Sequence, residues 1–134
     1  MAESQPEVIL VEDSPYESAL AYLALTRETS SVVQVPDLRT AARLAYGGGK
    51  GLAILGQRAI KRASNRQLRA LGIPAVGIGA NLSEADDRRA RAAGLSAVYR
   101  RPREWQAYLA LLGQVLAEWR VTRTGLAPHP ARTS

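Results

Sequence analysis

The sequence predicts an α/β protein of the doubly wound class, in which a five-stranded parallel sheet is built from five successive strand–helix units. Two observations carry this prediction. Five short apolar runs recur along the chain, and a stretch with helical periodicity follows each of them. The first run, residues 8–11, contains four consecutive apolar residues, three of them β-branched, as in a strand that is buried on both faces.

The size and composition of the chain agree with one globular domain. Its 134 residues are enough to bury a core, and 46% of them are apolar. The absence of cysteine excludes disulfides and thiolate metal sites. Because no signal peptide or membrane-spanning run is visible either, we expect a cytoplasmic protein. The net charge of +6 permits an acidic partner or nucleic acid, but it does not bear on the fold.

The first strand leads into two adjacent carboxylates, Glu12 and Asp13. In an open parallel sheet, ligand crevices form at this carboxyl end of the strands. The next four residues, Ser-Pro-Tyr-Glu at 14–17, predict a capping box with proline at the first helical position. The carboxylates therefore belong to a strand-to-helix turn that faces a possible site, although acidic residues also begin many helices without any such role.

The later strands share apolar runs that proline or glycine bounds, and they are predicted at residues 31–35, 51–55, 75–79 and 96–99. The helices share apolar faces at helical spacing, and they are predicted from 15 to about 27, from 37 to 46, to an end near 71, from 83 to 93 and from 102 to about 121. Residues 56–63 are basic and are predicted to be irregular. The domain is expected to span residues 7–123, between a disordered N-terminus, 1–6, and a disordered tail, 124–134.

Neither glycine cluster predicts a nucleotide site. Gly47-Gly48-Gly49-Lys50-Gly51 precedes a strand, whereas a phosphate loop follows one, and the second cluster, Gly77–Gly79, lacks the third glycine of a dinucleotide fingerprint. The single histidine, His129, lies in the predicted tail. With no nucleophile–base pair or metal cluster visible, we expect no enzyme activity, no cofactor and no metal.

Four segments resemble the receiver domains of response regulators: Val-Ile-Leu-Val-Glu-Asp-Ser at 8–14, Gly-Ile-Pro-Ala-Val at 72–76, Ala-Ala-Gly-Leu-Ser-Ala-Val-Tyr at 92–99, and Arg101-Pro102. The resemblance covers about residues 7–120 and implies the flavodoxin-like (βα)5 receiver fold. Because no output domain follows in this sequence, it implies a stand-alone receiver. The interval between the third and fourth strands is a few residues shorter than in the family.

The resemblance also implies a phosphorylation pocket, and this chain departs from that pattern. In receivers an Asp after the third strand accepts the phosphoryl group and helps to hold Mg²⁺, but Gly56 stands there. Gly79 replaces the hydroxyl residue that ends the fourth strand, whereas Arg101 keeps the charge of the family's Lys. Glu12 and Asp13 match. We therefore expect a degenerate pseudo-receiver with a vestigial pocket that is not stably phosphorylated, and in which Arg101 pairs with one of the two carboxylates.

The last predicted helix suggests a binding surface, because its apolar side chains outnumber those of a single core-facing stripe. The candidate interface residues are Tyr99, Trp105, Tyr108, Leu112 and Trp119. Leu112 is itself best explained as a core residue, whereas Trp119 is expected near an exposed end. The end of the chain weakly resembles single-domain response regulators paired with bacterial and cyanobacterial phytochrome kinases. We expect a homodimer through the fourth helix, fifth strand and last helix.

Two function classes follow from these observations. The first is a protein–protein interaction module in two-component signalling that acts without phosphorylation, with a histidine kinase, conceivably of the phytochrome type, as its partner. The second is a basic nucleic-acid-associated domain, since two arginine-rich clusters lie at 58–69 and 88–103. No helix-turn-helix or stacking aromatic motif supports the second class, and an arginine-rich solvated surface explains the charge better than a binding role does.

Overall fold

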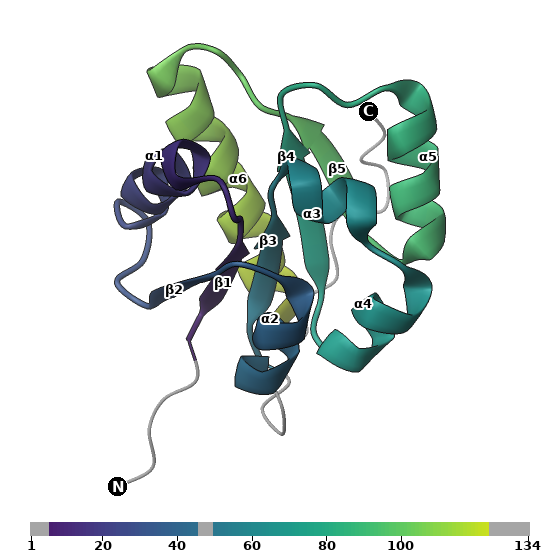
Figure 1. Cartoon of the computed structure of the whole chain (residues 1–134). Coiled ribbons are helices and arrows are strands. Elements are labelled where there is room, and N and C mark those ends of the chain that lie inside the picture. Colours follow the sequence, from purple (N-terminus) through teal and green to yellow (C-terminus); the bar gives the residue numbers. More distant parts are fainter. Residues whose placement is uncertain (1–5, 46–49, 124–134) are drawn as a thin grey trace, which may run out of the picture.

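Within residues 6–45 and 50–123, which the computed structural model describes, five strands form one parallel sheet in the order β2-β1-β3-β4-β5 (Figure 1). The strands are β1 (Val8–Val11), β2 (Val32–Val35), β3 (Leu52–Leu55), β4 (Ala75–Gly79) and β5 (Ala97–Arg100). Every residue of β1, β3 and β4 is buried. The sheet confirms the predicted fold class and the five predicted strands to within one residue at each end.

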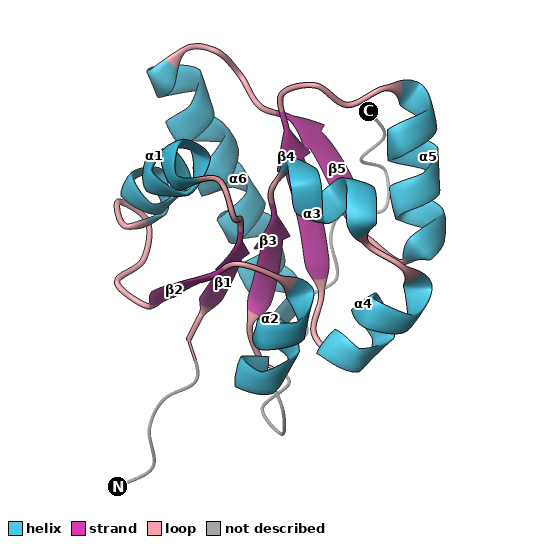
Figure 2. Ribbon diagram, in the orientation of Figure 1, coloured by secondary structure: helices cyan, strands magenta, loops and turns pink. Residues whose placement is uncertain are grey.

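The described part of the chain also holds six helices: α1 (Pro15–Leu25), α2 (Leu38–Ala45), α3 (Gln57–Arg62), α4 (Asn65–Leu71), α5 (Glu84–Ala93) and α6 (Trp105–Arg123). Helices α1 and α6 cover one face of the sheet, and the other four cover the opposite face (Figure 2). None of these helices combines the length and apolarity that a membrane span requires.

Successive side chains of the central strands point to opposite faces of the sheet, so the protein has two hydrophobic cores, one on each face. Val8 and Leu10 of β1 pack with α1 and α6, whereas Ile9 and Val11 pack with the helices on the other face. A strand that contributes to both cores has no polar face, which is why β1 and β3 show as unbroken apolar runs in the sequence.

The prediction of an irregular stretch over 56–63 is wrong, because residues 57–62 form α3. One buried side chain anchors this short helix: Ile60 has no exposed surface. A Cβ on Gly77 of β4 would lie 2.7 Å from Ile60 Cδ1, so the missing side chain lets α3 pack closely on the sheet. A helix of six residues with a single buried anchor shows no periodicity, and the sequence pattern therefore missed it.

Two helix ends and one predicted cap also differ from the predictions. Helix α1 ends at Leu25, and α6 begins at Trp105, three residues after the proline that was expected to start it. The capping box predicted at Ser14 does not form, since its side chain makes no cap hydrogen bond. The predicted cap at Asp37 is confirmed, because its Oδ1 accepts from the Thr40 amide at 2.8 Å. The termini expected to be disordered, 1–6 and 124–134, lie outside the described residues except for residue 6.

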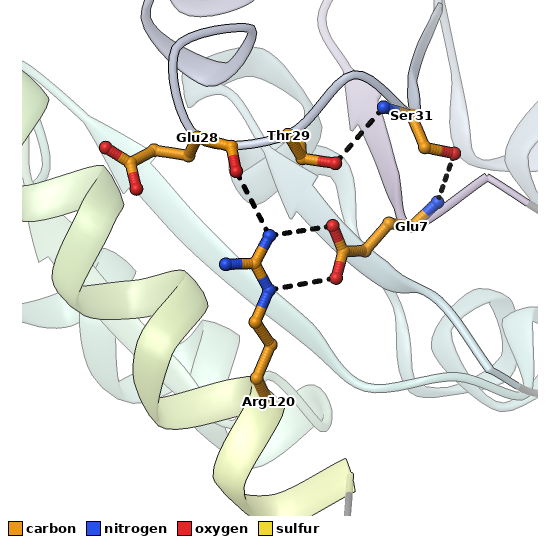
Figure 3. A network of polar contacts seen from close by, with 5 residues as sticks. All are labelled: Glu7, Glu28, Thr29, Ser31 and Arg120. Atoms are coloured by element: carbon orange, nitrogen blue, oxygen red, sulfur yellow. Dashed lines mark hydrogen bonds and ion pairs between the residues drawn. The ribbon is translucent and has the colours of Figure 1, made fainter.

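A polar network fastens the end of α6 to the start of β1 (Figure 3). The Arg120 guanidinium donates to both carboxylate oxygens of Glu7, at 2.9 and 2.8 Å, and to the carbonyl of Glu28 at 3.2 Å. The Glu7 amide in turn donates to Ser31 Oγ at 3.0 Å. Such a bidentate pair fixes geometry as well as charge. It holds α6 and the loop between α1 and β2 against the amino end of the sheet.

Replacing Arg120 with alanine is expected to lower the free energy of unfolding by about 1–2 kcal/mol, because it leaves the mostly buried Glu7 carboxylate without its bidentate partner. Arg120→Lys recovers only part of this loss, since the single ammonium of lysine cannot reproduce the two parallel hydrogen bonds that the guanidinium donates to the carboxylate of Glu7. Urea denaturation at neutral pH measures both effects. Arg66→Ala, which removes an exposed arginine from α4, serves as the control and is expected to change stability little. Equal losses for Arg120→Ala and Arg66→Ala would contradict the prediction.

Candidate functional site at the carboxyl end of the sheet

The vestigial pocket predicted from the sequence lies at one edge of the sheet. Glu12 follows β1, Gly56 follows β3, Gly79 ends β4 and Arg101 follows β5, so the parallel strands bring them together. A cleft of about 270 Å³ opens there. Its lining consists of Glu12, Ser14, Glu17, Gln57, Arg58, Ile78, Gly79, Ala80, Asn81 and Arg101.

The carboxylate of Glu12 occupies the space above Gly56. Glu12 is only 6% exposed, and its Oε2 accepts from the Ser14 amide at 3.0 Å. A Cβ built on Gly56 would overlap Oε1 of Glu12 and lie 2.6 Å from its Cδ. The position from which a receiver's phosphoacceptor side chain would project is therefore filled by another residue's carboxylate.

Burial has an electrostatic consequence for Glu12. Desolvation raises the pKa of this carboxyl, the hydrogen bond from the Ser14 amide opposes the shift, and the charges of Asp13 and Glu17 add to it. Because the pKa of Glu12 is higher in the folded protein than in the unfolded chain, protonated Glu12 favours the folded state. This contribution to the free energy of unfolding is lost as the pH rises through the pKa that Glu12 has in the folded protein.

Glu12→Gln is therefore expected to stabilise the protein near neutral pH. The amide keeps an oxygen that can accept from Ser14 and removes the buried charge. The gain in urea midpoint should shrink as the pH falls through the raised folded-state pKa, and it should be smallest below about 4, where the carboxyl of the parent becomes protonated in the unfolded state as well. Unfolding curves of parent and variant across this range measure the effect. A difference that stays constant with pH would mean that the charge of Glu12 is not what costs stability.

Arg101 does not pair with Glu12 or Asp13, as the sequence predicted, but with Glu17 of α1. Its Nε lies 3.2 Å from Glu17 Oε1, and its Nη2 donates to Oε2 at 3.2 Å. The Arg101 guanidinium carbon also lies 5.8 Å from the centre of the Tyr108 ring, and burial raises the pKa of Tyr108 to about 12. The sequence had assigned Glu17 to a capping box, so this partner was missed.

Asp13 lies in a different environment from its neighbour. Its Oδ2 is 3.5 Å from Nη1 of Arg58 and 3.9 Å from Nη1 of Arg62, both on α3. It lines a separate small cleft beside Asp37. The predicted acidic pair therefore separates, with Glu12 in the main cleft and Asp13 beneath the arginines of α3.

Gln57 is a site residue that no sequence pattern indicated. Its Nε2 donates to the carbonyl of Asn81 at 3.0 Å, and its Oε1 accepts from the Asn81 amide at 2.7 Å. The same side chain covers Gly79, since a Cβ there would lie 3.0 Å from Gln57 Oε1. This double hydrogen bond ties the start of α3 to the loop after β4, and only the three-dimensional contact reveals it.

The residues present do not fit the divalent cation that the receiver resemblance implies. Among the described residues, no three acidic, histidine or cysteine side chains gather closely enough to hold a metal ion. Glu12 and Asp13 line separate clefts, and the arginine side chains of α3 lie against Asp13. A hard cation with oxygen ligands needs carboxylates that converge, and these two do not.

The predicted interface on β5 and α6 is wrong for three of its residues. Tyr108, Leu112 and Trp119 are 6%, 1% and 8% exposed, because α6 packs its apolar side chains against the sheet and α1. Tyr99 and Trp105 are half-buried, and their interface role stays a prediction. The largest exposed apolar side chains of the described residues are Tyr16, Tyr22 and Leu23 on α1, Val33 on the edge strand β2, and Val121.

No protein-family model and no curated protein matches this sequence. Solved structures do match its fold. A phosphorylated cyanobacterial phytochrome response regulator is 19% identical with a TM-score of 0.68, and the match covers 96% of this chain and all of that one. A response regulator in red light signalling of R. palustris is 16% identical with a TM-score of 0.67, over 95% and 99% of the two chains.

A third similar structure is the receiver domain of a sensor histidine kinase from Pseudomonas aeruginosa PAO1, with a magnesium ion coordinated in its active site cleft. It is 21% identical with a TM-score of 0.64, and the match covers 85% of this chain and 99% of that one. Sheet order, helix placement and these matches lead to one conclusion. The chain has the flavodoxin-like fold of response-regulator receiver domains.

Proposed function

We propose that this chain is a cytoplasmic pseudo-receiver of two-component signalling that binds a protein partner without being phosphorylated. The observation that carries the proposal is the Glu12 carboxylate lying where the phosphoacceptor side chain would begin, above Gly56. The receiver fold supports the signalling context, and the altered pocket supports independence from phosphorylation.

The chemistry of the cleft explains why phosphorylation is not expected. An acyl phosphate forms only when a carboxylate attacks phosphorus, and Gly56 supplies no side chain for that attack. Gly79 offers no hydroxyl to the phosphoryl oxygens, and the Arg101 charge is already neutralised by Glu17. Glu12 is an unsuitable substitute, because it is buried and held by the Ser14 amide.

The surface of α1 supports the binding role. Helices on a protein surface usually bury one apolar stripe and expose a polar face. In α1, by contrast, Tyr16 is 69% exposed and Leu23 is 57% exposed, in addition to the buried residues Ala21, Ala24 and Leu25. Exposed apolar groups gathered on one element often mark a docking surface. This helix begins directly after the candidate site, so it is the proposed contact for a histidine kinase or another signalling protein.

One experiment tests both halves of the proposal. The chain is incubated with acetyl phosphate and magnesium, and its intact mass is measured. Its affinity for the histidine-bearing domain of a kinase encoded in the same genome is then measured with and without that treatment. We expect no added phosphoryl mass and an unchanged affinity. Tyr16→Ser combined with Leu23→Ser is expected to weaken binding at least about tenfold, as for residues at the centre of an interface.

The matched control is Val121→Ser, which also removes an exposed apolar side chain but from α6. It should leave the affinity unchanged. Addition of a phosphoryl group, or a kinase affinity that depends on acetyl phosphate, would overturn the phosphorylation-independent function. Loss of binding in the control variant alone would place the docking surface elsewhere than α1.

A further inference from the structure

A positively charged cleft of about 690 Å³ lies between the loop that follows β4 and the end of β5. It adjoins the candidate site but lies outside it, because Glu12 and Gly79 do not line it. Arginine supplies half of the lining residues, and none of them is acidic. They are Ala80, Asn81, Arg100, Arg101, Pro102 and Arg103.

Two of the three arginines in this cleft are available to an anion. Arg101 is already paired with Glu17. Arg100 and Arg103 are exposed, and neither guanidinium forms a hydrogen bond or ion pair with the residues that the structure describes. The cleft therefore holds two guanidinium groups whose hydrogen-bond donors have no partner in the described part of the chain.

The nearest carboxylates do not pair with these two arginines. Glu84 and Asp87 line a smaller cleft on the other side of Arg100, but Asp87 is paired with Arg91, and neither carboxylate forms an ion pair with Arg100. Glu104 follows Arg103 in the sequence and is exposed, and it forms no ion pair with it. An anion in the cleft would thus not have to displace a carboxylate of the protein from either guanidinium.

Both walls of the cleft are held in place without a ligand. The backbone amide and carbonyl of Asn81 are bonded to Gln57, whereas its side-chain amide makes no hydrogen bond with the described residues. On the opposite wall, the Arg101 amide donates to the Gly79 carbonyl at 3.0 Å, and the ring of Pro102 restricts the backbone. A wall that is already fixed lowers the entropy cost of binding.

We propose that this cleft binds a small molecule through its diphosphate group. A guanidinium donates paired, charge-assisted hydrogen bonds to phosphate oxygens. A diphosphate presents one phosphoryl group to each of Arg100 and Arg103, whereas a single phosphate can occupy only one of them fully. The side-chain amide of Asn81 adds a neutral donor. No aromatic residue lines the cleft to stack on a base, so recognition depends on the diphosphate itself.

The fold explains why charge in the sequence did not indicate this site. The arginine-rich cluster at 88–103 divides into two groups. In α5, Arg89 donates to the carbonyls of Ala63 and Ile60, at 3.0 and 2.6 Å, and Arg91 is paired with Asp87. Only the arginines at the end of the cluster reach the cleft. The inference does not rest on the proposed function, because it involves neither phosphorylation nor the surface of α1.

Titration calorimetry of the full chain with inorganic pyrophosphate, without magnesium and at low salt, tests the inference. We expect pyrophosphate to bind at least about tenfold more tightly than orthophosphate. Arg100→Gln combined with Arg103→Gln should weaken pyrophosphate binding at least about tenfold, as for lost hydrogen bonds to a charged group. The corresponding lysine pair keeps the charge but not the paired hydrogen bonds, so its affinity should be intermediate.

The matched control is Arg66→Gln combined with Arg69→Gln, which removes the same charge from exposed positions on α4. It should change the affinity less than about twofold. Equal losses in the two glutamine pairs would show general attraction to a basic surface, and this would overturn the proposal. Absence of pyrophosphate binding, or equal affinities for pyrophosphate and orthophosphate, would overturn it as well.

Two nucleotides show which part of a larger ligand is recognised. ADP carries a diphosphate and AMP a single phosphate on the same nucleoside. We expect ADP to bind at least about tenfold more tightly than AMP, and to compete with pyrophosphate. Equal binding of the two nucleotides would assign recognition to the nucleoside and contradict the inference. Urea midpoints of all variants are measured in parallel, and they should match that of the parent because the replaced side chains are exposed.

Discussion

Trp119→Ala is expected to lower the free energy of unfolding by about 3–5 kcal/mol, the usual cost of truncating a buried tryptophan. Trp119 is 8% exposed and packs in the core between α6 and the sheet. The cost arises within one chain, because the cavity forms in its own core. The loss in urea midpoint should therefore be the same at low and high protein concentration.

Trp105→Ala is the matched control, because Trp105 belongs to the same helix but is half-buried and stacks edge-on against Tyr108, with ring centres 6.2 Å apart. Its loss should be clearly smaller. If Trp119→Ala does not fold, Trp119→Phe provides a milder version whose loss should still be independent of concentration. A Trp119→Ala variant that keeps the stability of the parent and only dissociates a dimer would contradict the assignment to the core.

The sequence was informative about the sheet because each strand carries a local signal. Residues 8–11 and 52–55 are apolar throughout, and proline or glycine bounds the later strands, so strand positions follow from short stretches of chain. The location of the site follows from the same signal. Once the strands are parallel, Glu12, Gly56 and Gly79 must lie at one edge of the sheet.

The pairing of charges could not be predicted in this way. Coulomb attraction has little directional preference, and several carboxylates lie within reach of several arginines at the same edge. Small displacements of the turns decide that Arg101 meets Glu17, while Asp13 meets Arg58. The reciprocal bonds between Gln57 and Asn81 were invisible for the same reason, since they depend on where two loops approach.

The sequence pattern also could not predict which helix would keep exposed apolar side chains. Both α1 and α6 are apolar on more than one side, so periodicity alone does not reveal which helix is covered on both sides. In the fold, α6 lies against the sheet and α1, and it buries Leu112 and Trp119. Helix α1 lies toward the edge of the layer, and Tyr16 and Leu23 stay exposed.

Gly56→Asp is expected to destabilise the protein by about 3 kcal/mol and not to restore phosphorylation. The new side chain requires the place that the Glu12 carboxylate occupies. Glu12 must then leave its hydrogen bond with the Ser14 amide, and a second carboxylate enters a buried site without a cation of its own, since Arg101 is held by Glu17. An uncompensated buried charge costs about 3–5 kcal/mol, and rotation of the flexible Glu12 side chain into the cleft relieves part of that cost.

Two companion variants separate the contributions of volume and charge. Gly56→Ala also displaces Glu12 but adds no charge, so it should cost only about 1 kcal/mol, close to the value of the lost hydrogen bond. Adding Glu12→Ala to Gly56→Asp vacates the space and returns the site to one carboxylate, and most of the stability should return. Urea unfolding measures stability, and intact mass after acetyl phosphate treatment measures phosphorylation. Should Gly56→Asp be as stable as the parent and take up a phosphoryl group, Glu12 would not be what fills the acceptor position.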